Sequence, residues 1–186
     1  MRDQGLTPLG LTQAQVQVVW LKLANIGPRT ALPGAAADAY ALLEDAGEVL
    51  RTLRQRYPNL QLAFASSRTY GGWATGTLNP EPYAFESGFA VQWAIQAQIE
   101  QSGGRPVSAY RTGDVRYDVV PWLGWGPYIW AGGATDPLAG WTRADFAADG
   151  VHPSSSGVQK VGRMLLDYFK GSELSQCWFL AGRNCG

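Results

Sequence analysis

The chain has 186 residues, enough for one domain with a buried core, and we treat 1–186 as that domain with a C-terminal tail at 171–186. Its 15 basic and 15 acidic residues cancel, which argues against nucleic acid and an anionic membrane surface as partners. No apolar run approaches the roughly 18 residues of a membrane span. Two cysteines and one histidine are too few for a zinc site, so no metal or cofactor is expected.

The first half of the chain predicts a strand, a helix and a second strand. An irregular lead-in over 1–12 precedes a β-branched, apolar run at 15–23, typical of a buried parallel strand. Residues 36–57 carry apolar side chains at helical spacing. After Pro58, residues 60–65 read as the second strand. Strand, helix and strand form one crossover unit of an α/β sheet.

The second half continues the pattern. Residues 83–100 predict a helix whose inner face carries Phe85, Phe89, Trp93 and Ala97. A third strand is expected at 117–123, shortened by Pro121. Residues 154–170 predict a final helix that presents Val158, Val161, Leu165 and Phe169 on one face and has serines to cap its start.

The run from Asp149 to Ser154 contains His152, the only histidine of the chain. Chemistry that needs an imidazole near neutral pH must use this residue. Asp149 lies three positions earlier, close enough to fold back onto the ring and fix its tautomer, as in acyl transfer. The alternative is a capping loop, with Asp149 in a turn and His152 merely near a helix start.

This Asp-Gly-Val-His-Pro-Ser run, followed by Gly157 and an amphipathic stretch, resembles the last block of the SGNH (GDSL-type) hydrolases. The resemblance implies a three-layer α/β/α, flavodoxin-like sheet, with His152 and Asp149 as two members of a Ser-His-Asp triad. It also implies that Asn25, at the end of the first strand, donates to an oxyanion. Asn25 could instead shape the turn before Gly27 and Pro28.

The family's Gly-Asp-Ser block, which carries the nucleophile, occurs nowhere in this sequence. The resemblance therefore covers about the C-terminal two thirds of a family domain, and the expected sheet is N-terminally truncated. Residues 79–89 and 122–128 also resemble a bacterial subgroup of such proteins. Three explanations stand: a fragment or mis-started reading frame, a degenerate member with a binding role, or a nucleophile relocated to Ser66 or Ser67.

Candidate substrate residues follow the second strand, because ligands of α/β sheets bind at the carboxyl ends of the strands. Ser67, Arg68 and Tyr70 lie there, and Arg68 suits a carboxylate or phosphate group. Trp125 could stack on a sugar. Each also has a structural interpretation: a loop hydroxyl bonded to backbone, an ion-pair partner, or packing.

The reaction implied by the resemblance is hydrolysis of a carboxylic ester, such as an acetyl group on a glycan, through an acyl-enzyme. The alternative is a truncated or degenerate, non-catalytic remnant that binds a carbohydrate or a protein. The strand at 15–23 should have an open edge, which predicts self-association or an N-terminal complement. Cys177 and Cys185 either close a small disulfide loop in an oxidising compartment or remain free thiols. No leader follows Met1, yet a longer precursor could carry one, so secretion and the periplasm stay open.

Overall fold

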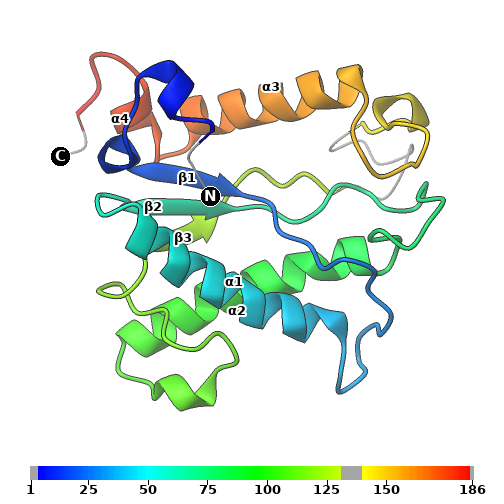
Figure 1. Ribbon diagram of the computed structural model, residues 1–186, viewed down its shortest axis with the longest axis horizontal. Coiled ribbons are helices and arrows are strands. Elements are labelled where there is room, and N and C mark those ends of the chain that lie inside the picture. Colours follow the sequence, from blue (N-terminus) through cyan, green and yellow to red (C-terminus); the bar gives the residue numbers. More distant parts are fainter. Residues whose placement is uncertain (1–3, 131–139, 185–186) are drawn as a thin grey trace.

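The computed structural model describes residues 4–130 and 140–184, in which three parallel strands form one sheet. The strands are β1 (Val18–Leu21), β2 (Leu62–Ala65) and β3 (Trp122–Trp125), hydrogen-bonded in that order. Helices α1 (Asp38–Arg56) and α2 (Tyr83–Ser102) cover one face, and α3 (Ser155–Gly171) covers the other (Figure 1). The α/β class predicted from the sequence is confirmed.

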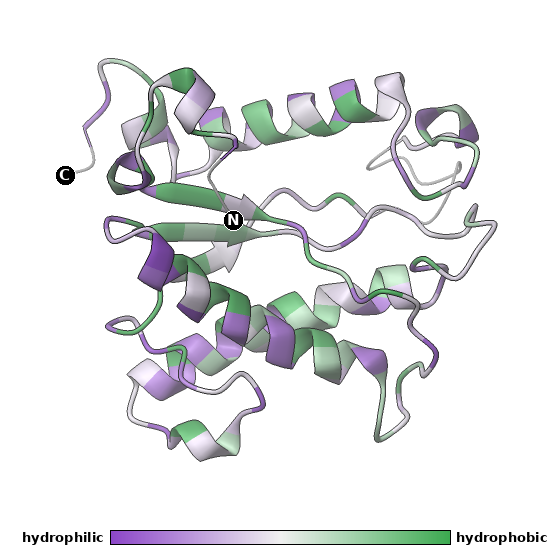
Figure 2. Ribbon diagram, viewed as in Figure 1, coloured by the Kyte–Doolittle hydropathy of each residue, from purple (hydrophilic) through white to green (hydrophobic). Residues whose placement is uncertain are grey.

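The core lies between the sheet and the α1–α2 layer. The strands are predominantly hydrophobic along their length (Figure 2), as expected for a parallel sheet covered on both faces. The buried cluster on this side contains Leu42, Leu43, Leu50, Ala63, Ala90, Ala94, Ala97, Val115, Val120 and Leu123. On the α3 side, the Phe64 ring packs against Tyr168 and Phe169, with ring centroids 5.5 and 5.7 Å away.

The third strand begins after Pro121, so the prediction of 117–123 is wrong in its boundaries. The N–H groups of Val119 and Val120 both donate to the Arg116 carbonyl, at 2.9 and 3.0 Å, and hold these residues in a turn. Proline has no N–H for a sheet ladder. The pairing with β2 therefore starts where the Trp122 N–H donates to the Gln61 carbonyl at 2.9 Å.

The buried face of α2 is made mostly of small and amide side chains; of the predicted residues, Ala97 is buried and Trp93 packs, partly buried, against the core cluster. Its buried residues include Ala84, Ala90, Ala94, Ala97, Gln98 and Gln101. Small residues let the helix approach the sheet closely. The Gln98 side-chain oxygen accepts from the Leu123 N–H of β3 at 2.7 Å, so this buried N–H has a hydrogen-bond partner. Phe85 is exposed, and Phe89 stacks on Trp93 with ring centroids 5.8 Å apart. On α3, Val158 is likewise exposed.

β1 is the edge strand of the sheet formed by the described residues. Its register pairs Val18 with Leu62 and Leu21 with Ala65 of β2. The edge of β1 that faces away from β2 is the one predicted to be open. Self-association through this edge, or its pairing with an N-terminal complement, stays a prediction. Over residues 4–130 and 140–184, no helix combines the length and apolar character that crossing a membrane requires.

The C-terminal segment packs back onto α3. Helix α4 (Gln176–Phe179) places Phe179 against Phe169, with ring centroids 5.4 Å apart and the rings stacked. Cys177 is disulfide-bonded. Cys185, the other cysteine of the chain, lies outside the described residues.

Candidate active site

Asp149 and His152 form the carboxylate–imidazole pair that the sequence predicts. His152 Nδ1 is hydrogen-bonded to Asp149 Oδ2. The other carboxylate oxygen, Oδ1, accepts from the backbone N–H groups of Val151 at 2.9 Å and His152 at 3.0 Å. The bond to His152, then these two N–H groups, lower the pKa of Asp149 to about 2. The ionised carboxylate can only accept, so it fixes the proton on Nδ1 and leaves the lone pair of the neutral ring on Nε2.

The loop that carries this pair is closed by its own backbone. The Ala147 N–H donates to the His152 carbonyl at 2.7 Å, and the Gly150 N–H donates to the Ala147 carbonyl at 3.0 Å. Gly150 has a φ of +71°, and a Cβ there would lie 1.8 Å from the Trp73 carbonyl oxygen. Only glycine fits this turn. The turn presents the His152 side chain, 64% exposed, to the outside.

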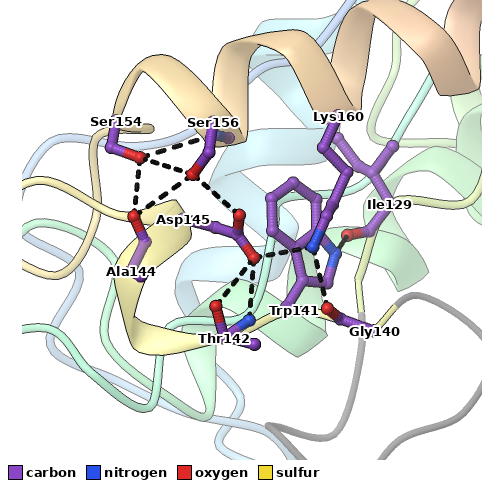
Figure 3. Close-up of polar contacts among 10 residues, drawn as sticks. Ile129, Gly140, Trp141, Thr142, Ala144, Asp145, Ser154, Ser156 and Lys160 are labelled. Carbon is purple, nitrogen blue, oxygen red and sulfur yellow. Dashed lines mark hydrogen bonds and ion pairs between the residues drawn. The ribbon is translucent and has the colours of Figure 1, made fainter.

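A buried polar network anchors this loop to the start of α3 (Figure 3). Asp145 Oδ2 accepts from Lys160 Nζ at 2.6 Å and from Thr142 N and Oγ1 at 2.9 and 3.1 Å. Its Oδ1 accepts from Ser156 Oγ at 2.9 Å. Burial alone would raise the pKa of Asp145, but these donors, Lys160 first, lower it to about 2. The network fixes the two ends of the segment that holds Asp149 and His152.

The loop after β2 ties the segment to the carboxyl edge of the sheet. The Thr75 N–H donates to the Asp149 carbonyl at 3.0 Å, and Asn79 Nδ2 donates to the Asn25 carbonyl at 2.6 Å. One loop therefore contacts both the Asp149–His152 turn and the residue that follows β1. These segments lie at the end of the sheet toward which the strand arrows point (Figure 1).

The Asn25 side chain already has a partner, because its Nδ2 donates to the Asp38 carbonyl at 2.8 Å. One N–H of the amide is left for another acceptor. Among the hydrogen bonds of the described residues, none joins Asn25 to His152. Its role as an oxyanion donor stays a prediction.

Ser66 and Ser67 are buried, each with 1% of its surface exposed. Ser66 Oγ donates to the Pro127 carbonyl at 2.6 Å and accepts from Trp20 Nε1 at 3.0 Å. Ser67 Oγ donates to the Arg68 carbonyl at 3.4 Å. Their hydroxyl protons thus go to backbone carbonyls, and neither serine is hydrogen-bonded to His152 in the part of the chain that the structure describes.

Two of the predicted substrate residues share a groove. Ser67 and Trp125 line it together with Phe85, Gly88, Phe89, Gln92 and Tyr128. Tyr70 packs elsewhere, edge-on against Trp73 and Trp130, with ring centroids 4.9 and 6.2 Å away. Trp73 in turn contacts Phe146 of the His152 segment at 5.2 Å between centroids. Tyr70 therefore takes part in packing that supports the loop.

Arg68 lies beside a second cation, Lys22, which the sequence interpretation missed. Burial lowers the pKa of the Arg68 guanidinium, and burial followed by the charge of Arg68 lowers the pKa of Lys22 to about 8. The signal in the sequence was a lysine in an otherwise apolar strand segment, directly after Leu21. In the described parts of the chain, no group of three or more His, Cys, Asp or Glu side chains gathers as a metal site would require.

Comparison with known proteins yields no relative: no family model, no curated protein and no solved structure matches this chain.

Proposed function

We propose that this chain carries the base and its orienting acid of an SGNH-type hydrolase of carboxylic esters, such as an acetylated glycan. The observation that supports the proposal is the hydrogen bond from His152 Nδ1 to Asp149, with Nε2 pointing away from the carboxylate on an exposed side chain. The parallel strands and the helices on both faces are compatible with the flavodoxin-like sheet of that family, of which 1–186 would be the C-terminal part.

In this mechanism His152 Nε2 takes the proton of a serine hydroxyl as its oxygen attacks the ester carbonyl. Asp149 stabilises the imidazolium that forms, and the remaining N–H of Asn25 donates to the developing oxyanion. The proton then passes from Nε2 to the leaving alcohol, and an acyl-serine remains. Water, deprotonated by the same nitrogen, then attacks the acyl carbon. The bond to the serine oxygen breaks, that oxygen takes the proton back from Nε2, and the acid is released. Ser66 and Ser67 have other partners, so the nucleophile in this mechanism is the serine of a Gly-Asp-Ser block, which the sequence of residues 1–186 does not contain.

The second candidate is a binding protein without catalysis. The groove lined by Ser67 and Trp125 favours it, because Phe85, Trp125 and Tyr128 all expose aromatic surface there. Aromatic faces of this kind pack against the apolar faces of sugars. A glycan would then bind on the α2 side of the sheet.

Fluorophosphonate labelling and turnover of p-nitrophenyl acetate separate these functions. The chain is assayed alone and together with a Gly-Asp-Ser-bearing segment, added in trans or fused before Met1. We expect labelling and turnover only with the added segment, both lost in His152→Ala and retained in Lys170→Gln, an exposed α3 control. If neither labelling nor turnover is seen with or without the added segment, the result favours the binding protein. Labelling of Ser66 or Ser67 in the bare chain, dependent on His152, would show a relocated nucleophile.

A further inference from the structure

Lys22 and Arg68 stand at neighbouring strand ends. Leu21 and Leu23 both pack against the core cluster beneath α1 and α2, so Lys22 between them points to the other face, since side chains alternate along a strand. Trp20, on that same face, donates from Nε1 to the Oγ of Ser66, the residue after β2, at 3.0 Å. Lys22 continues this row at the carboxyl edge, next to the loop that carries Arg68.

Both cations are half-buried, and neither has a carboxylate partner in the described parts of the chain. Arg68 Nε is buried and has no hydrogen-bond partner. Burial of an unpaired charge is costly. Burial first, and then the charge of Arg68, lowers the pKa of Lys22. Two neighbouring, unpaired like charges are unusual in a structural role.

The acids of the surrounding loops have other partners. Glu81 accepts from the N–H groups of Gly71 at 2.8 Å and Phe85 at 3.0 Å and from Trp130 Nε1 at 2.9 Å. Asp149 is bonded to His152. The missing negative charge is therefore not supplied by these side chains.

We propose that Lys22 and Arg68 bind the anionic group of a ligand, a carboxylate or a phosphate, at the carboxyl edge of the sheet. A planar guanidinium and an ammonium can together donate several charge-assisted hydrogen bonds to one oxyanion. Ligand sites of parallel α/β sheets lie at this edge, and the loop of Arg68 also contacts Asp149 through Thr75. Resting on the proposed function, the ligand is an ester that carries a negative charge close to its reacting group.

The test follows the Arg68 Nε–H signal by NMR while sodium phosphate or sodium acetate replaces chloride at constant ionic strength. The pH is kept below the Lys22 pKa of about 8, and Arg68→Gln assigns the signal. We expect a saturable shift in the wild type, about tenfold or more weaker binding in Lys22→Gln, and unchanged binding in Lys170→Gln. Lys22→Arg keeps the charge and should retain binding, which guards against a loss caused by misfolding.

Tighter binding of phosphate than of acetate assigns a phosphoryl ligand, and the reverse assigns a carboxylate. A drift that does not saturate with either anion, or equal binding by Lys22→Gln and wild type, would overturn the proposal. The measurement needs no turnover, so a failed esterase assay leaves it intact and its own failure leaves the hydrolase proposal standing.

Discussion

Replacing Lys160 by methionine removes the cation that pairs with the buried Asp145 carboxylate while keeping an apolar stem of similar length. The Asp145 side chain is 8% exposed and that of Lys160 is 29% exposed. Lys160 Nζ also donates to the Gly140 carbonyl at 2.8 Å and lies 5.0 Å from the centroid of the Trp141 ring. The substitution therefore removes an ion pair, a hydrogen bond and a cation–π contact at the base of the His152 segment (Figure 3).

The depression of the Asp145 pKa from 3.8 to about 2 corresponds to about 2 kcal/mol of stability at neutral pH. Loss of one partner of a fully buried pair costs about 3–5 kcal/mol. Thr142 and Ser156 still donate to the carboxylate after the change. We therefore expect Lys160→Met to lower the free energy of unfolding by about 2 kcal/mol at neutral pH. Because the folded-state pKa is depressed, this stability exists above 3.8 and is lost as the pH falls through 3.8 toward 2.

Urea unfolding of wild type and Lys160→Met, at neutral pH and near the folded-state pKa of Asp145, measures the loss of stability and its pH dependence. The difference in unfolding free energy between the two proteins should be smaller at the acidic pH. Lys170→Met, an exposed lysine of the same helix, serves as the control. The double variant Asp145→Asn/Lys160→Met should lose less than the sum of the single variants, since no charge is left unpaired. A Lys160→Met protein within about 0.5 kcal/mol of wild type would refute the assigned role of the network.

Other predictions concern the site and the sheet edge. Lys22→Met should raise the free energy of unfolding at neutral pH by about 1–3 kcal/mol. The pKa of Lys22 is about 8 in the folded protein and 10.5 in the unfolded chain, so the wild type gains stability as the pH rises through that range. The difference in unfolding free energy between the variant and the wild type, measured in urea, should therefore disappear at high pH. Gly150→Ala, with its Cβ 1.8 Å from the Trp73 carbonyl, should destabilise the protein by about 2–4 kcal/mol, and a neutral result would contradict the turn. In Asp149→Asn, nitrogen NMR of the sole histidine should show the proton no longer confined to Nδ1; an unchanged tautomer would show that the carboxylate does not set it. Residues 1–186 should sediment as a dimer or larger species through the β1 edge, and a monodisperse monomer would contradict this.

The local part of the candidate site could be predicted because its geometry is encoded within a few residues. Asp149 and His152 are three positions apart, and the glycine between them permits the return of the chain. The sequence did not predict Lys22 as a site residue, because its proposed role depends on Arg68, which lies far from it in the sequence. Asn25 depends in the same way on distant residues: its side-chain N–H donates to the Asp38 carbonyl, and its backbone carbonyl accepts from the Asn79 side chain.

The elements were predicted where periodicity matched burial and were wrong where another constraint prevailed. On α1, Ala39, Leu42, Leu43 and Leu50 are buried as their spacing indicates. On α2, close approach to the sheet selects alanines, so Ala97 of the predicted set is buried and Phe85 is exposed. The third strand begins later than predicted because Val119 and Val120 lie in a turn and the pairing starts at Trp122, after Pro121. Propensity alone does not distinguish these cases, since tertiary packing decides them.

The hydrogen bonds that shape the Asp149–His152 turn come almost entirely from residues 142–157, which makes the pair a portable unit. Ala147, Gly150, Val151 and His152 bind within the turn, and Ser154 caps the helix that follows. A scaffold that receives this unit must supply an N–H for the Asp149 carbonyl, as Thr75 does, and a cation for Asp145, as Lys160 does. Where backbone approaches as closely as the Trp73 carbonyl, position 150 must stay glycine. Protein engineers could graft the unit, helix included, onto the carboxyl edge of a designed parallel sheet and obtain an oriented imidazole without redesigning the strands.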